Sequence, residues 1–124
     1  MSLTRAATQA VLVLRVSYGL ALVAAPGRLA LRWLGESAGG ASVQVAVRGL
    51  GAREAMLHGG ALLALRRGAP LRPWLAASVA GDLTDVIATA AGRRQLPAGS
   101  PLATLAVGGG SALVSAALGA LVDR

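Results

Sequence analysis

Four apolar runs make up most of the chain, and each is close to the roughly 20 residues that a helix needs to cross a bilayer. The predicted helices span about residues 4–25, 42–65, 73–91 and 102–122. Glycine, proline and arginine interrupt the runs, and because the connections are short, neighbouring helices should run antiparallel. The sequence therefore predicts an all-α fold, an integral membrane four-helix bundle that forms one domain over residues 1–124.

A shorter amphipathic segment, "PGRLALRWLGES", follows the first run. Its Pro-Gly pair ends the preceding helix, and Leu29 and Trp33 then oppose Arg28 and Arg32. This pattern predicts a short interfacial helix between the first and second spans, with its tryptophan at headgroup depth.

The composition is that of a membrane protein rather than of a soluble domain. Hydrophobic residues make up 55% of the chain and charged residues 14%, against about 25% in globular domains, and the mean hydropathy is +0.64. All twelve basic residues are arginine, which is typical of a GC-rich bacterial genome. We therefore expect a multi-pass protein of a bacterial cytoplasmic (inner) membrane, with the lipid bilayer as its first partner.

The net charge of +7 does not indicate nucleic acid, because most arginines flank the apolar runs and aromatic residues make up only 2% of the chain. Flanking arginines suit anionic lipid headgroups. One side of the predicted bundle carries Arg5, Arg66, Arg67, Arg72 and Arg124, and the other side carries Arg28, Arg32, Arg93 and Arg94. This small difference favours a cytoplasmic N-terminus.

The residue types also limit the chemistry. Because the chain has no cysteine and a single histidine, it offers no thiolate site and no multi-histidine metal site. The stretch "GGGS" at 108–111 lacks the lysine and the strand-to-helix setting of a phosphate loop. We therefore expect no metal and no cofactor, and we interpret the small residues on this face of the fourth helix as a packing surface.

Six ionisable residues lie inside the predicted spans. They are Arg15 in the first span, Arg48, Arg53 and Glu54 in the second, and Asp82 and Asp85 in the third. Each unpaired charge at mid-span would cost roughly 2.5–3.5 kcal/mol. Because three arginines balance three carboxylates, we expect these side chains to face inward, where they pair, become neutral or line a wet cavity.

The candidate site joins residues that share faces of the first three helices. Glu54 and His58 lie one turn apart, and so do Asp82 and Asp85. Two aspartates so close repel each other, which favours protonation of one of them. Asp82, Asp85 and Glu54 are therefore the candidate catalytic acid and base residues. The candidate ligand-binding residues are Arg15, Tyr18, Arg48, Arg53, His58, Trp74 and Ser78.

The motif "RGLGARE", or Arg48-x-x-Gly51-x-Arg53-Glu54, is followed by an acidic third helix in a chain of four spans. In these features the chain resembles the DoxX-like group of small bacterial membrane proteins. The resemblance implies a four-helix membrane architecture. It also implies a role beside an oxidoreductase, because some members are described as subunits or partners of redox enzymes.

Three functions are compatible with these features. The one we favour is a cofactor-independent acid–base enzyme (isomerase, cyclase or hydrolase) for a small amphipathic or anionic substrate, held by Arg48 and Arg53. The second is a proton-coupled small-molecule carrier, in which Asp82 or Asp85 exchanges a proton for the substrate and a homo-oligomer completes the pathway. The third is an accessory subunit of a membrane redox or envelope complex, held together by its ion pairs.

Overall fold

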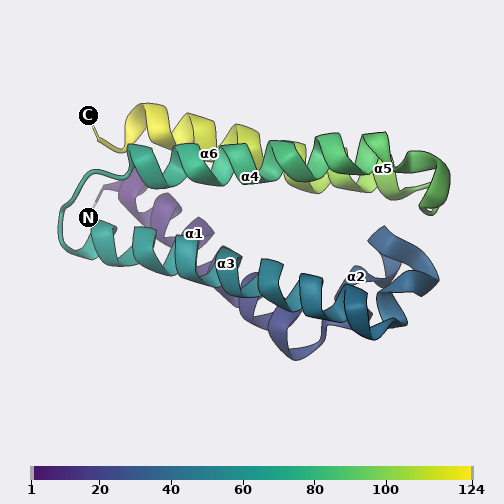
Figure 1. Cartoon of the computed structure of the whole chain (residues 1–124). Helices are drawn as coiled ribbons and strands as arrows, with labels where there is room; N and C mark the ends of the chain where they lie inside the picture. Colours follow the sequence, from purple (N-terminus) through teal and green to yellow (C-terminus); the bar gives the residue numbers. More distant parts are fainter. Residues whose placement is uncertain (1, 124) are drawn as a thin grey trace.

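Helices account for nearly all of the fold. The computed structural model describes residues 2–123, so Met1 and Arg124 lie outside the described residues. The long helices are α1 (Leu3–Ala24), α3 (Ala41–Arg66), α4 (Arg72–Ala91) and a continuous last stretch (Figure 1). That stretch comprises α5 (Ser100–Thr104), the π-helical turn η3 (Leu105–Gly109) and α6 (Gly110–Leu121). Residues 2–123 contain no strand, and the predicted all-α class is confirmed.

Three short elements join the long helices. They are α2 (Pro26–Leu34), the 3₁₀ helix η1 (Gly35–Gly39) and the 3₁₀ helix η2 (Arg93–Gln95). Pro26 occupies the first turn of α2, where its missing N–H costs no hydrogen bond. The predicted short helix is therefore present.

The tryptophan of α2 is bonded to α4 and α5, and its depth at the headgroups stays a prediction. The indole Nε1 of Trp33 donates to Thr89 Oγ1 of α4 at 2.8 Å, and the hydroxyl of Ser100 donates to the Trp33 carbonyl at 2.7 Å. These two bonds turn the indole toward α4 and tie α2 to the opposite side of the molecule. Arg28 and Arg32 are exposed, as the amphipathic pattern predicts.

The long helices form two layers, α1 with α3 and α4 with α6, and consecutive long helices run antiparallel (Figure 1). Two glycines allow α1 and α3 to approach closely. A Cβ atom added at Gly19 would lie 2.6 Å from Gly51 O, and one added at Gly51 would lie 2.6 Å from Gly19 O. Neither position has room for a side chain.

Small residues also form the contact of the last helical stretch with α4. A Cβ atom added at Gly108 would lie 3.3 Å from Asp82 O, Ser115 is buried, and Gly119 faces Leu75. The small-residue face of the fourth predicted helix is thus a packing surface, which we expected from its spacing.

Two apolar cores lie on either side of the middle of the molecule. One contains Leu12, Leu65, Leu71 and Leu75 with their neighbours, and the other contains Leu22, Ala30, Ala38 and Val47. On α1, Arg15 falls between Leu12 of one core and Leu22 of the other, and on α3, Glu54 falls between Val47 and Ala61. Polar side chains are therefore concentrated in the central section of the fold.

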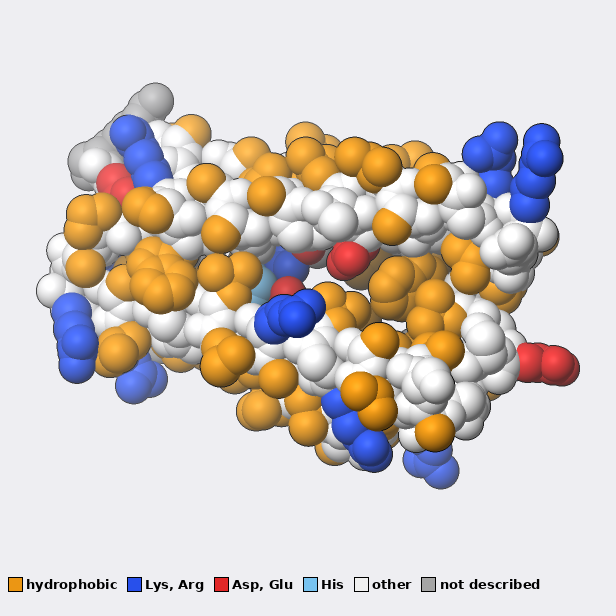
Figure 2. Space-filling model, viewed as in Figure 1, with side chains coloured by type: hydrophobic (Ala, Val, Ile, Leu, Met, Phe, Trp, Pro, Cys, Tyr) orange, Lys and Arg blue, Asp and Glu red, His pale blue; other side chains and the backbone are white. Residues whose placement is uncertain are grey.

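Large apolar side chains also cover the outside, including Leu14 (69% exposed), Met56 (68%), Ile87 (68%) and Leu113 (75%). Figure 2 shows such side chains over both layers. By length and composition, α1 and the stretch Ser100–Leu121 could each cross a membrane. Helices α3 and α4 are long enough but more polar, because each carries charged residues near its middle.

Candidate functional site

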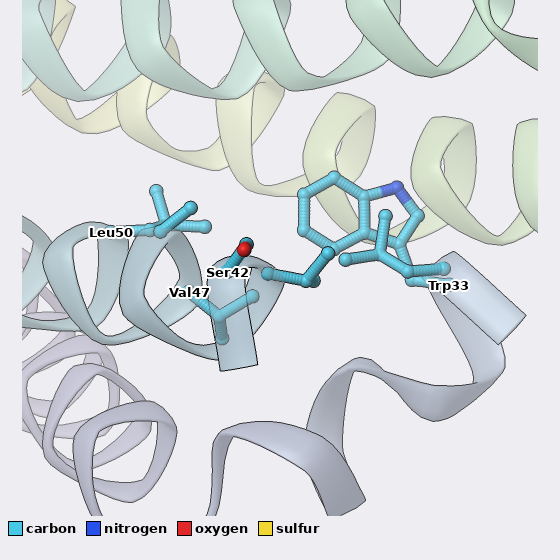
Figure 3. A pocket seen from close by; sticks show the side chains of 7 residues that line it. Trp33, Ser42, Val47 and Leu50 are labelled. Atoms are coloured by element: carbon cyan, nitrogen blue, oxygen red, sulfur yellow. The ribbon is translucent and has the colours of Figure 1, made fainter. Parts of the chain in front are cut away.

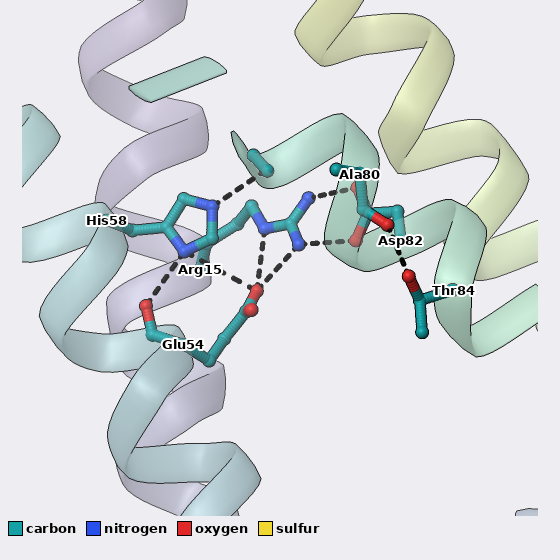
Figure 4. Close-up of polar contacts among 7 residues, drawn as sticks. Arg15, Glu54, His58, Ala80, Asp82 and Thr84 are labelled. Atoms are coloured by element: carbon teal, nitrogen blue, oxygen red, sulfur yellow. Dashed lines mark hydrogen bonds and ion pairs between the residues drawn. The ribbon is translucent and has the colours of Figure 1, made fainter. Parts of the chain in front are cut away.

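Arg15 of α1 lies at the centre of a cluster that joins both layers (Figure 4). Its NH1 and NH2 groups donate to the two carboxylate oxygens of Asp82 in α4, at 2.8 and 2.6 Å. Its Nε group donates to Glu54 Oε1 of α3 at 2.8 Å, and NH2 lies 2.7 Å from the same oxygen. One guanidinium thus holds two carboxylates, and the three side chains form what we call the Arg15 triad.

The triad is largely removed from solvent. The side chains of Arg15, Glu54 and Asp82 are 12%, 16% and 8% exposed. Charge-assisted, bidentate contacts of this kind are the strong form of an ion pair. All three nitrogens of the guanidinium are engaged with protein carboxylates, so Arg15 has little capacity left to bind a ligand anion.

His58 and Ser78 extend the cluster between α3 and α4. His58 Nδ1 lies 2.8 Å from the carbonyl oxygen of Glu54, and Nε2 lies 2.9 Å from Ser78 Oγ. Since a carbonyl only accepts, Nδ1 carries a proton, and in the neutral imidazole Nε2 accepts from the Ser78 hydroxyl. Both side chains are fully buried, with relative exposures of 1%, so this pair ties the layers together and is closed to a substrate.

Asp85 is the carboxylate that the triad leaves out. It lies almost one turn beyond Asp82 on α4 and is half-buried. Among residues 2–123, its carboxylate makes no hydrogen bond and no ion pair. In Figure 2 a hollow opens between the two layers, and both acidic and basic side chains lie at its rim.

An apolar cavity of about 320 Å³ lies between α2 and α3 and is open to the outside, where Ser42 and Ala46 are exposed (Figure 3). Its lining residues are Trp33, Leu34, Ser42, Val43, Ala46, Val47 and Leu50. Leu50 is one turn from Glu54 on α3, and Trp33 is bonded to Thr89, which is one turn from Asp85 on α4. Leu50 and Glu54, and likewise Thr89 and Asp85, are therefore separated by roughly 6 Å of axial rise on their helices.

The other predicted site residues lie outside the Arg15 triad. Arg48 is exposed and donates through Nε to the carbonyl of Val23 at 3.2 Å. Arg53 is exposed and makes no ion pair with a described residue. Tyr18 is 48% exposed, and its hydroxyl is close enough to Glu54, Asp85 and Arg15 to interact with their charges. Trp74 packs against Gly60, where an added Cβ atom would lie 2.5 Å from the indole ring.

This arrangement changes the expected charge balance. The predicted set held three arginines and three carboxylates, whereas the interior of the structure holds Arg15 with Glu54, Asp82 and Asp85. One positive and three negative formal charges leave an excess of negative charge in the central section. The buried and half-buried part of the site therefore holds more carboxylates than guanidinium groups.

Sequence reasoning missed the cavity and the role of Trp33 in lining it. The wall of the cavity consists of Leu, Val and Ala side chains that any membrane helix would carry, so the sequence held no specific signal for them. The described residues also contain no group of three or more His, Asp or Glu side chains placed to hold a metal ion.

Comparisons of this chain with protein-family models, with curated proteins and with solved structures find no match. The resemblance to DoxX-like proteins therefore rests on the sequence motif and the layout of the helices.

Proposed function

We propose that this chain is an integral membrane protein that crosses a bacterial inner membrane with α1, α3, α4 and the α5–α6 stretch. Two of these four helices are long and apolar enough by composition alone. The other two direct Glu54, His58, Ser78 and Asp82 to the interior and leave Met56 and Ile87 on the outside. An inward polar face with an outward apolar face is what the bilayer selects.

We further propose that the protein is a cofactor-independent acid–base enzyme and that Asp85 is its catalytic residue. The observation that carries this proposal is the contrast between the carboxylates. Glu54 and Asp82 are held by Arg15, whereas Asp85 is half-buried, has no partner among residues 2–123 and lies one turn from Thr89, which binds Trp33. A carboxyl group in an apolar, partly buried setting is suited to proton transfer near neutral pH.

A single free carboxyl group supports isomerisation better than hydrolysis. An isomerase or cyclase neither gains nor loses protons overall. One carboxyl group can therefore donate a proton to the substrate as an acid and then remove another proton from it as a base. A hydrolase needs in addition a positioned water and a second proton-transfer group. In this scheme the Arg15 triad is a positioning device, which fixes α1 and α3 against the helix that carries Asp85.

The test uses solvent deuterium, because it does not require that the substrate be known. Purified protein in lipid nanodiscs is incubated in D₂O with the nonpolar extract of the cells that produce it, and the extract is analysed by mass spectrometry. We expect the wild type to place deuterium at carbon in one compound or a small set of compounds, and Asp85→Asn to abolish this exchange. Glu36→Gln, which changes an exposed carboxylate far from the site, serves as the matched control.

Equal exchange by the wild type and Asp85→Asn would contradict the proposal, and so would exchange in neither. In the second case, uptake of a compound into sealed proteoliposomes that depends on a pH gradient and on Asp85 would identify a proton-coupled carrier instead. The loss of Asp85 should leave the fold intact, because this side chain has no partner among the described residues to lose.

A further inference from the structure

We propose that the reaction at Asp85 passes through a positively charged species, and that the substrate is an uncharged, largely apolar molecule with a carbon–carbon double bond or an epoxide. This inference rests on the proposed acid–base function and names its substrate class. Three features of the structure carry it, namely the excess of negative charge, the apolar cavity and the indole ring that faces it.

The charge of the central section favours a cation and disfavours an anion. Arg15 is engaged by Glu54 and Asp82, and the other arginines of the predicted spans, Arg48 and Arg53, are exposed. Arg15, the buried guanidinium, is thus not available to bind a substrate carboxylate beside Asp85. A positive charge that develops near Asp85 would instead lie close to carboxylates that exceed their cationic partners in number.

The cavity is suited to the uncharged ground state. Of its seven lining residues, Ser42 is the one with a hydroxyl, and Trp33 is the one aromatic residue. At about 320 Å³ the cavity is at the lower end of the range for small-molecule sites. A permanently charged substrate would find few polar partners on this lining, whereas an apolar molecule needs none.

Trp33 contributes an indole face beside the site. Its N–H group is used in the bond to Thr89, so the orientation of the ring is fixed and it lies against the cavity (Figure 3). An indole face attracts a cation more strongly than any other aromatic side chain. Because Thr89 is one turn from Asp85, the indole N–H is bound to α4 one turn away from the residue that carries the carboxyl group.

The proposed step is balanced without a co-reactant. The protonated Asp85 carboxyl group gives its proton to one carbon of the double bond or to the epoxide oxygen, and the positive charge appears on carbon. The resulting carboxylate then takes a proton from an adjacent carbon, a new double bond forms, and Asp85 is again protonated. The product is an isomer of the substrate, cyclised where another double bond of the same molecule attacks the cation.

The test compares three eight-carbon amphiphiles that differ in charge: n-octylammonium, n-octanol and n-octanoate. Trp33 is made the single tryptophan with Trp74→Phe, and its fluorescence is titrated with each compound in the same nonionic micelles. We expect saturable binding of octylammonium that is about tenfold tighter than that of octanol, with octanoate the weakest. The ammonium group corresponds to the stage at which Asp85 has given up its proton and is a carboxylate, so Asp85→Asn should remove this tenfold preference.

A cavity-filling variant, Ala46→Leu, separates a bound molecule from general effects of detergent. It should weaken octylammonium binding about tenfold and leave the charges unchanged. In the unaltered chain, the rise in unfolding midpoint that each amphiphile produces gives the same ranking without the Trp74 substitution.

Equal affinity for octylammonium and octanol would overturn the inference, and so would an unchanged preference in Asp85→Asn. The outcomes for the two proposals are distinguishable. If Asp85-dependent deuterium exchange is found but octylammonium shows no preference, the acid–base function stands and the cationic reaction is wrong. If octylammonium is preferred but no exchange occurs, the proposal of a cation-binding site stands and the proposal of an acid–base enzyme is wrong.

Discussion

Replacing Arg15 with methionine should destabilise the protein far more than the loss of one contact would suggest. Methionine fills much of the same volume, but the change leaves the carboxylates of Glu54 and Asp82 without the guanidinium that lies 2.6–2.8 Å from them. Removing one partner of a buried ion pair costs about 3–5 kcal/mol. Because two carboxylates lose the same partner and both are less than one-fifth exposed, we expect a loss near 5 kcal/mol, the upper end of that range.

The neutral triple variant Arg15→Met/Glu54→Gln/Asp82→Asn tests the cause of this loss. A buried ion pair that is replaced as a whole by neutral groups often costs little, so the triple variant should recover at least about 3 kcal/mol. The free energy of unfolding is measured by titrating detergent micelles with SDS and following helix content. If Arg15→Met costs less than about 1 kcal/mol, or if the triple variant is no more stable than the single one, stranded charge is not the source of the effect.

Three further changes test individual contacts. Gly51→Ala should cost about 1–3 kcal/mol, because its Cβ atom would collide with the backbone of α1, whereas Gly49→Ala on the same helix meets nothing within 4 Å and should be neutral or stabilising in the same SDS titration. Trp33→Phe and Thr89→Val should each cost about 1 kcal/mol, and the double variant should cost no more than the larger single loss, since both remove one hydrogen bond; additive losses in the double-mutant cycle would refute this bond. Asp123→Asn should weaken the cap on the first amides of α4 by about 1 kcal/mol, and their hydrogen exchange should accelerate; unchanged exchange rates would show that this carboxylate does not protect them.

The helices were predictable because residue types close to each helix end determine where it begins and ends. Apolar runs near 20 residues, Pro26 at the start of α2 and Pro73 in the first turn of α4 act within a few residues of the positions that they determine. The Arg15 triad was partly predictable for a different reason. Unpaired charge in an apolar interior is so costly that oppositely charged residues on inward faces are expected to meet.

The remaining parts of the site depend on distances that no local pattern contains. Arg53 is adjacent to Glu54 in the sequence, yet the helical rotation between them directs one outward and the other to Arg15. Trp33 bonds Thr89 across 56 positions of the chain. The cavity is a region where the side chains of α2 and α3 do not fill the space between the two helices. The sequence of either helix alone does not predict such a gap, because it depends on how the two helices pack.

The motif that suggested a DoxX-like protein gains a physical explanation from the fold. In Arg48-x-x-Gly51-x-Arg53-Glu54, Gly51 is the point where α3 touches Gly19 of α1. Glu54 follows Gly51 by nearly one turn, and Arg15 precedes Gly19 by one turn. The glycine contact thus brings the backbones close enough for the glutamate and the arginine to pair, and the motif combines a packing residue with the charge that it positions.

The order in which the triad is synthesised has a consequence for membrane insertion. Arg15 is translated first, and its partners Glu54 and Asp82 follow 39 and 67 residues later. In the membrane topology that we propose, α1 alone would carry an unpaired arginine, at roughly 2.5–3.5 kcal/mol by insertion scales. The nascent chain therefore gains its full electrostatic compensation only when α4 arrives. We infer that α1, α3 and α4 leave the insertion machinery as a partly assembled unit rather than one helix at a time.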